Sequence, residues 1–224
     1  MRLLVVLVLT LAMARSSRAE CPANTVNVLS DTYTTSAPSD TAYRQASDCD
    51  VYYCWQQVGR ASYDLVAGTM YVNALGANAD ASSSLFTHDV FTLFGPPSSS
   101  PITFAARAHV ELSIDCNGVP PSASASIRQG TSNLAETARA QCGDGTTDIG
   151  ISITCETAAT FDLYMTAEVQ AGEPDSGGQA EARVSLTFPD LPPGYSLVSC
   201  QGYATGPTVA TRRESWGALK TLYK

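Results

Sequence analysis

Only two histidines occur in the 224-residue chain, and each has a carboxylate close by in sequence. His88 precedes Asp89, and His109 lies two residues before Glu111. A hydrolase would need such a base to activate a nucleophile. Adjacent residues of a strand point to opposite faces, which separates His88 from Asp89, whereas His109 and Glu111 share the polar face. Neither Gly-x-Ser-x-Gly nor His-Glu-x-x-His occurs, and we predict no catalytic residue.

Paired carboxylates are the second candidate chemistry, because a glycosidase uses two of them about 5–10 Å apart. The strand positions that offer carboxylates are Asp64, Asp89, Glu111, Asp162, Glu168 and Glu181. With 21 acidic residues in the chain, some pair of this kind is inevitable. A carbohydrate-active enzyme on a jelly-roll scaffold is therefore the alternative rather than the main prediction.

The segment from Cys142 to Asp148 is rich in oxygen ligands and resembles a cation loop. Asp144 and Asp148 are its candidate calcium ligands, although calcium takes about six to eight oxygens and no Glu stands at the twelfth position of an EF-hand. The alternative is a polar turn that holds Cys142 for a disulfide. We predict no cofactor apart from calcium at this segment.

Aromatic residues crowd the stretch between Tyr43 and Tyr63. Aromatic rings on one face of a sandwich can stack on sugar rings, which makes Tyr52, Tyr53 and Trp55 candidate ligand-binding residues. Core packing of Tyr53 and Trp55 is the alternative. The partner that the first reading implies is an extracellular glycan, and an envelope protein is the other candidate.

Seven cysteines show no metal-binding spacing, so we read them as disulfide candidates. They are Cys21, Cys49, Cys54, Cys116, Cys142, Cys155 and Cys200. Six paired cysteines allow about 15 patterns, and the sequence leaves the unpaired one open. We favour Cys49–Cys54, which closes a short loop, and one bridge within Cys116, Cys142 and Cys155.

The elements that must position these residues are strands. Period-two alternation recurs between clusters of Gly, Pro, Asn and Asp, which is typical of an antiparallel sandwich or barrel. In Ile102–Ile114 the apolar residues share one face and the polar residues the other. The expected strands are Val51–Val58, Tyr63–Leu75, Leu85–Phe94, Ile102–Ile114, Ile149–Cys155, Phe161–Val169, Ala180–Phe188 and Tyr195–Tyr203. We predict an all-β fold, a single antiparallel β-sandwich that is jelly-roll-like.

The chain divides into four segments. Residues 1–19 have a charged start, an apolar run and a Ser17-Arg18-Ala19 ending, which predicts a cleaved signal peptide and a secreted or cell-envelope protein. Residues 20–50 form an N-terminal segment with an edge strand at Thr25–Leu29, and residues 51–205 form the sandwich. Residues 206–224 are a linker and a short amphipathic helical tail.

Charge excludes one class of partner. The full chain carries a net charge of −8, and removal of residues 1–19 leaves 10 basic against 21 acidic groups. Phosphate binding needs a basic stripe, so no nucleic acid partner is expected. The apolar run after Arg2 is shorter than the roughly 20 residues that a bilayer requires, and no transmembrane segment is predicted in the mature chain.

Three segments near the C-terminus share a pattern with a known group of proteins, namely Phe161-Asp162-Leu163, Leu186-Thr187-Phe188 and Leu191-Pro192-Pro193-Gly194-Tyr195-Ser196. Through them the chain resembles the exported β-sandwich domains of bacterial PEP-CTERM-type proteins. The resemblance covers roughly residues 60–203 and implies fold and location. The tail departs from that family, because Ser215–Lys224 replaces the Pro-Glu-Pro sorting signal, and it resembles terminal Trp-Gly-x-Leu-Lys-x-Leu-Tyr-Lys segments of other bacterial secreted proteins. We expect a non-catalytic protein that acts through surface contacts, with a glycan-binding module as an alternative.

Overall fold

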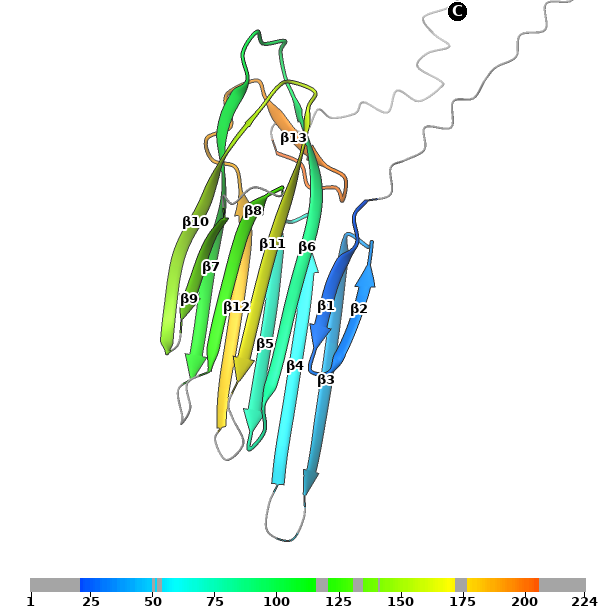
Figure 1. The fold of residues 1–224 in the computed structure, drawn as a ribbon, viewed down its shortest axis with the longest axis vertical. Helices are drawn as coiled ribbons and strands as arrows, with labels where there is room; N and C mark the ends of the chain where they lie inside the picture. The colour runs from blue at the N-terminus through cyan, green and yellow to red at the C-terminus, as the bar shows by residue number, and fades with distance from the viewer. Residues whose placement is uncertain are drawn as a thin grey trace, which may run out of the picture.

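Thirteen strands in the described residues form two antiparallel sheets that pack face to face (Figure 1). The computed structural model describes residues 21–49, 51, 54–115, 121–130, 135–140, 142–171 and 177–205. One sheet has the order β2-β1-β6-β11-β8-β9, with β13 also paired to β6, and the other has the order β10-β7-β12-β5-β4-β3. The predicted all-β sandwich is confirmed, while its jelly-roll connectivity stays a prediction.

The seven-stranded sheet consists of β1 (Asn24–Val28), β2 (Asp31–Thr35), β6 (Ala81–Phe94), β8 (Ser122–Gln129), β9 (Ala135–Ala140), β11 (Thr160–Ala171) and β13 (Ser196–Ser199). The six-stranded sheet consists of β3 (Ser39–Cys49), β4 (Cys54–Asp64), β5 (Thr69–Ala77), β7 (Ile102–Asp115), β10 (Gly143–Cys155) and β12 (Gly177–Thr187).

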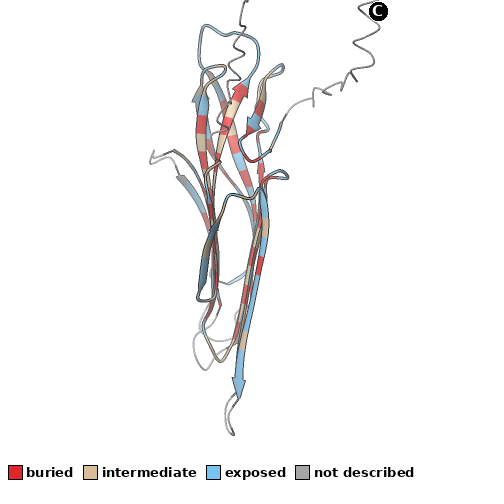
Figure 2. Ribbon diagram, turned by 90° about the vertical axis from the view of Figure 1, so that its right-hand side faces the viewer, coloured by how far each residue is buried: buried red, intermediate tan, exposed pale blue. Residues whose placement is uncertain are grey.

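Alternation along each strand produces the two faces of each sheet. In β7 every second residue from Phe104 to Ile114 is buried, while Arg107, His109 and Glu111 are exposed. The same pattern runs through β6 and β11, and buried positions face the space between the layers (Figure 2). One face of each sheet therefore forms the core and the other meets solvent, as the sequence predicts.

The side chains that fill the core differ in size along the strands. Small residues such as Ala74, Ala106 and Ala182 are fully buried in the body of the six-stranded sheet. Large rings gather around Phe91, whose ring centroid lies 5.5 Å from that of Phe161 and 5.8 Å from that of Tyr203. The aromatic cluster thus joins the sheets to the segment that follows β12.

Several strand boundaries differ from the sequence-based expectation. Tyr63–Leu75 is not one strand, because a turn separates β4 from β5. Asp64 Oδ1 accepts a hydrogen bond from the N–H of Ala67 in this turn at 3.0 Å, and Gly68 follows with a φ of 69°. Strands β2, β3, β8 and β9 were not predicted. They are rich in Ser, Thr, Ala or charged residues, and their apolar alternation is faint.

The N-terminal segment also differs from the expectation. The strand predicted at Thr25–Leu29 is β1, but it lies between β2 and β6 and is not at the edge. The edge strand on this side of the sheet is β2, and β9 is the edge strand on the other side. Val26 and Val28 of β1 are buried, because the β1–β2 hairpin places its apolar face over the core.

Disulfides connect distant parts of the chain. The predicted Cys49–Cys54 bridge is confirmed, and it closes the β3–β4 hairpin with a Cα–Cα distance of 4.1 Å. An unpredicted bridge joins Cys21 to Cys200, 179 residues apart. Cys142 is disulfide-bonded as well. Cys155 has a free thiol among the described cysteines, and burial raises its pKa.

Several predictions lie outside the described residues. They concern the signal peptide at 1–19, Tyr52, Tyr53, Cys116, and the linker and helical tail at 206–224. The described part of the chain contains no helix, so within it nothing has the length and apolar composition of a membrane-crossing helix.

Buried Asp89 holds the C-terminal segment against β6. Its Oδ1 accepts hydrogen bonds from the N–H of Gln201 at 3.2 Å and from the N–H of Val90 at 2.8 Å. Burial raises the pKa of Asp89 above its ordinary value of 3.8, and the bonds from Ser199, Gln201 and Val90 oppose this rise only in part. The Cys21–Cys200 bridge lies beside this contact in sequence.

The raised pKa predicts a pH-dependent stability. Between the unfolded and folded pKa values of Asp89 the folded protein binds the proton more tightly, so the free energy of unfolding falls as pH rises through this window. Asp89→Asn keeps an acceptor for both N–H groups and should lose this contribution. Urea unfolding of both proteins from about pH 4 upward tests the point. Identical pH profiles would contradict it.

Candidate ligand-binding groove

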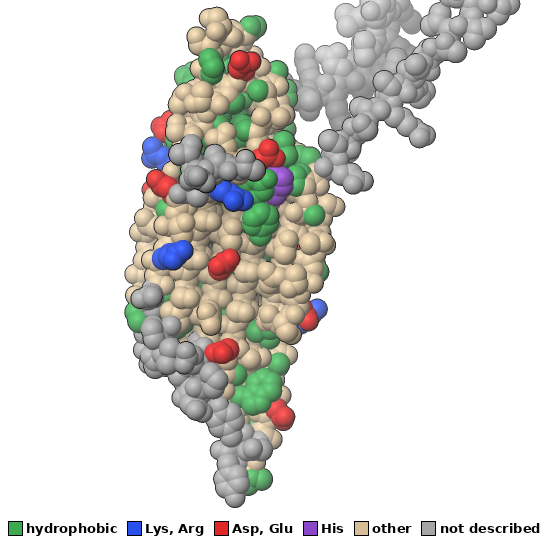
Figure 3. Space-filling view, in the orientation of Figure 1, with side chains coloured by type: hydrophobic (Ala, Val, Ile, Leu, Met, Phe, Trp, Pro, Cys, Tyr) green, Lys and Arg blue, Asp and Glu red, His purple; other side chains and the backbone are tan. Residues whose placement is uncertain are grey.

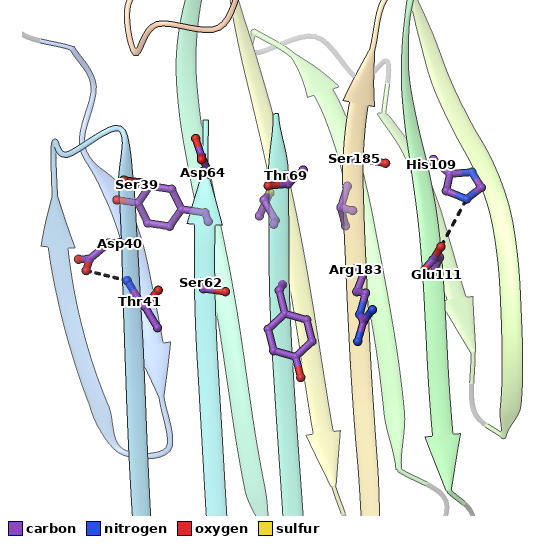
Figure 4. A pocket seen from close by; sticks show the side chains of 14 residues that line it. Ser39, Asp40, Thr41, Ser62, Asp64, Thr69, His109, Glu111, Arg183 and Ser185 are labelled. Atoms are coloured by element: carbon purple, nitrogen blue, oxygen red, sulfur yellow. Dashed lines mark hydrogen bonds and ion pairs between the residues drawn. The ribbon is translucent and has the colours of Figure 1, made fainter. Parts of the chain in front are cut away.

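A groove of about 640 Å³ lies on the six-stranded sheet (Figure 4). Its residues come from β3, β4, β5, β12 and β7, and so it crosses the strands rather than following one of them. The lining residues are Ser39, Asp40, Thr41, Ser62, Tyr63, Asp64, Thr69, Met70, Tyr71, His109, Glu111, Arg183, Val184 and Ser185.

Strand register arranges the outward-facing lining residues in two rows. One row runs Thr41, Ser62, Tyr71, Arg183 and Glu111, and the other runs Ser39, Asp64, Thr69, Ser185 and His109. Successive members lie on neighbouring strands, which are about 4.8 Å apart. The groove therefore presents hydroxyl, carboxylate, guanidinium and imidazole groups at regular intervals, with one aromatic ring in the middle of the first row.

Tyr71 is the most constrained of these side chains. The guanidinium carbons of Arg60 and Arg183 each lie 5.4 Å from the centroid of its ring. Its hydroxyl donates a hydrogen bond of 3.1 Å to Glu181 Oε2. Burial, followed by the nearby carboxylate of Glu181, raises the pKa of Tyr71, so the phenol keeps its proton. The ring is thus fixed by its neighbours before any ligand arrives.

Arg183 and His109 contact carboxylates within the groove and beside it. Arg183 Nε donates to Glu181 Oε1 at 2.7 Å. His109 Nδ1 lies 2.6 Å from Asp148 Oδ1, and His109 Nε2 lies 3.8 Å from Glu111 Oε1. The prediction that His109 and Glu111 share the polar face is confirmed. Arg183 therefore meets a ligand with its charge already partly compensated.

The strand register sets the spacing of the groove's hydroxyl, imidazole and carboxylate groups. Ser185 lies opposite His109 in the strand register, yet no hydrogen bond joins their side chains in the described structure. Asp64 and Glu111 lie on strands separated by three inter-strand spacings, about 14 Å. This separation exceeds the distance at which two carboxylates act together on a glycosidic bond.

The structure separates the two candidate calcium ligands. Asp144 and Asp148 lie in β10, not in a loop, and four residues of extended strand place them about 13 Å apart. Asp144 Oδ1 accepts a hydrogen bond from Ser113 Oγ at 2.7 Å, while Asp148 contacts His109. No group of three or more metal-ligating side chains occurs among the residues that the structure describes.

Trp55 lies away from the groove. It is the second residue of β4, opposite Asp48, and it is partly buried. Seven residues, or about 23 Å of strand, separate it from Ser62. Tyr52 and Tyr53, which were predicted to act with Trp55, lie outside the described residues. The aromatic stretch and the groove are therefore at different places on the same hairpin.

His88 belongs to the opposite surface, the outer face of the seven-stranded sheet. Figure 3 shows a face of the molecule on which charged side chains are few and scattered. As predicted, His88 points away from Asp89, which is buried. Its Nε2 lies 2.7 Å from Asp162 Oδ1, and its ring stacks on Tyr164 at 4.1 Å. Arg128 lies 4.8 Å from the centroid of the same tyrosine ring. This arrangement gives a tyrosine–arginine contact comparable to that of Tyr71, but it is not part of the groove on the six-stranded sheet.

Sequence reasoning missed Tyr71, Arg183 and Ser185. Their outward position follows from the alternation of β5 and β12. Which strands lie next to each other does not follow from it, because β5 pairs with β12 across more than 100 residues of chain. A prediction of strand pairing was the missing signal.

Comparison with known proteins adds little. No family model matches the sequence, and no curated protein matches it. One similar solved structure is TmCBM61 in complex with beta-1,4-galactotriose, with 10% identity and a TM-score of 0.31 over 65% of this chain and 88% of that chain. Another is the enzymatically active domain of bacteriophage CBA120 tailspike protein 4, with 10% identity and a TM-score of 0.29. That match covers 76% of this chain and only 20% of the tailspike chain. Similarity at this level carries no argument, and the site rests on its own geometry.

Proposed function

We propose that the protein is an extracellular, non-catalytic glycan-binding protein and that the groove on the six-stranded sheet is its binding site. The observation that carries this proposal is the row of Ser62, Tyr71 and Arg183 across three neighbouring strands of a groove of about 640 Å³. An aromatic ring flanked by hydroxyl and planar charged groups suits a sugar, which offers an apolar ring face and hydroxyls at its rim.

The remaining lining supports a neutral ligand. Thr41, Thr69 and Ser185 add hydroxyl groups that donate and accept hydrogen bonds. Arg183 is already paired with Glu181, so its charge is partly compensated before binding. A glycan without charged groups would meet these directional partners.

The proposed location is the extracellular space or the cell envelope. The disulfides Cys21–Cys200 and Cys49–Cys54 support it, because such bonds persist in oxidising compartments. The predicted signal peptide at 1–19 and the resemblance to PEP-CTERM-type exported domains point the same way.

Binding to a panel of immobilised oligosaccharides and insoluble polysaccharides tests the proposed function. The folded, disulfide-intact protein should be retained by at least one neutral glycan, and the reduced and unfolded protein should not. The absence of retention on every member of a broad panel would contradict the proposal. Release of reducing sugar during the incubation would contradict its non-catalytic part.

Salt should have little effect on this binding. Because the expected ligand is neutral, screening removes little of the interaction. We expect the Kd for a retained oligosaccharide to change by less than about twofold between low salt and about 0.5 M salt. Isothermal titration calorimetry at the two salt concentrations measures this change, and a steep loss of affinity would indicate a charged ligand instead.

A further inference from the structure

The outer edge of the six-stranded sheet is covered by its own side chains. Among the described strands, β3 has only one neighbour in the sheet, β4, so one side of its backbone pairs with no other described strand. A free edge of this length is a template for another strand. The contacts along β3 nevertheless occupy several of its outward-facing backbone groups.

Backbone N–H and C=O groups point to alternate sides along a strand, and this alternation identifies the groups of β3 that face away from β4. Cys49 lies opposite Cys54 with a Cα–Cα distance of 4.1 Å, which matches a pair without hydrogen bonds between the strands. The N–H and C=O of Cys49 therefore point away from β4. The same holds for every second residue back along β3, including Ser47, Gln45, Tyr43 and Thr41.

Charged side chains bind these outward-facing groups. The N–H of Thr41 donates to Asp40 Oδ1 at 2.7 Å, and the N–H of Cys49 donates to Asp48 Oδ1 at 2.8 Å. Between them, Arg44 Nη1 donates to the carbonyl oxygen of Tyr43 at 3.1 Å. Thr41, Tyr43 and Cys49 all belong to the set of alternate residues whose backbone groups face away from β4.

The opposite edge of the sheet has a cap of the same kind. In the part of the chain that the structure describes, β10 pairs only with β7, and the N–H of Gly150 donates to Glu136 Oε2 at 2.6 Å. Glu136 belongs to β9 of the other sheet. Its carboxylate therefore covers a backbone donor at the second exposed edge of the six-stranded sheet.

We propose that these caps prevent two copies of the chain from pairing edge to edge through β3. The blocked partner is a second copy of β3, because an antiparallel pair of identical 11-residue edges would join two six-stranded sheets into one. The carboxylates of Asp40 and Asp48 bind the N–H groups of Thr41 and Cys49, which a pair of β3 strands would need for its own hydrogen bonds. The same carboxylates would also face carboxylates of the second copy, and like charges repel.

The double variant Asp40→Ala/Asp48→Ala tests this proposal through the mass in solution. Light scattering after size exclusion, over a dilution series, should give one chain for the wild type and a concentration-dependent two-chain mass for the variant. The charge-matched control Asp80→Ala/Glu168→Ala, at exposed positions away from β3, should stay at one chain. A wild type that already forms dimers, or a double variant that behaves like this control, would overturn the proposal.

A third substitution separates strand pairing from unspecific association. Gln45→Pro removes an outward N–H without removing a bond to β4, so it should return the double variant to one chain. If the mass stays at two chains, association does not use the β3 edge and the proposal fails. Far-ultraviolet circular dichroism confirms the sheet in every variant. Should Asp40→Ala/Asp48→Ala not fold, Asp48→Ala alone provides the same comparison, with a smaller shift in mass expected.

Discussion

Replacing Tyr71 with alanine should weaken binding of a retained glycan by at least about 30-fold, or about 2 kcal/mol. The ring lies at the centre of the groove and is held by Arg60, Arg183 and Glu181. Its loss removes the apolar surface for the sugar and the hydroxyl that orients Glu181. Titration calorimetry with the best oligosaccharide of the panel measures the change in Kd.

Tyr164→Ala is the matched control for this experiment. Tyr164 is also a partly buried tyrosine on the outer face of an inner strand, and it too has an arginine near its ring. It belongs to the other sheet, so its removal should leave the Kd unchanged. Equal losses of affinity in the two variants would show that the groove is not the binding site.

Replacing Cys21 and Cys200 together with serine should lower the free energy of unfolding by about 5 kcal/mol. The bridge closes a loop across 179 residues and so restricts the unfolded chain strongly. It also ties the start of the described chain to the segment that Asp89 holds against β6. Urea unfolding of the wild type and the variant measures the difference.

The second described bridge supplies the comparison. Cys49 and Cys54 are five residues apart, so the same reasoning gives about 2 kcal/mol for the corresponding double serine variant. The long bridge should therefore contribute clearly more than the short one. Equal losses, or a larger loss at the hairpin, would contradict the account of Cys21–Cys200 as the main covalent restraint.

The alternation of apolar and polar residues predicted the strands in which this pattern is strong, and little else of the fold. β7 is the clearest case, because Phe104 through Ile114 alternate without interruption. β3 shows the limit, since its edge position leaves only Ala42 buried and its sequence carries almost no apolar signal. Gly143–Asp148 shows a second limit. Its turn-forming residues suggested a loop, but pairing with β7 makes it the first half of β10.

The site was harder to predict than the fold, for a physical reason. Tyr71, Arg183 and Glu111 become neighbours only through the β5–β12 and β12–β7 registers. Those registers depend on long-range pairing and not on local pattern. Density of aromatic residues instead drew attention to Trp55, which lies on the same strand as Ser62 but near its other end. The local sequence therefore pointed to the β3–β4 hairpin, which contributes to the groove, but to a part of that hairpin that lies outside the groove.

The correct cysteine prediction and the missed one have the same explanation. Cys49 and Cys54 are close in sequence, so a hairpin brings them together without further information. Cys21 and Cys200 meet only because the chain ends of the sandwich lie beside β6, where Gln201 Nε2 also donates to the carbonyl oxygen of Pro22 at 2.9 Å. That proximity follows from the tertiary fold alone.

Backbone amide chemical shifts, recorded while a retained oligosaccharide is added to the wild-type protein, test the central claim most directly. The account predicts the largest changes around Tyr71, Arg183 and Glu111, on three neighbouring strands of the six-stranded sheet, with β8 and β11 unchanged. Changes confined to the seven-stranded sheet, or to the hairpin end at Cys54 and Trp55, would contradict it. They would place the glycan somewhere other than the groove.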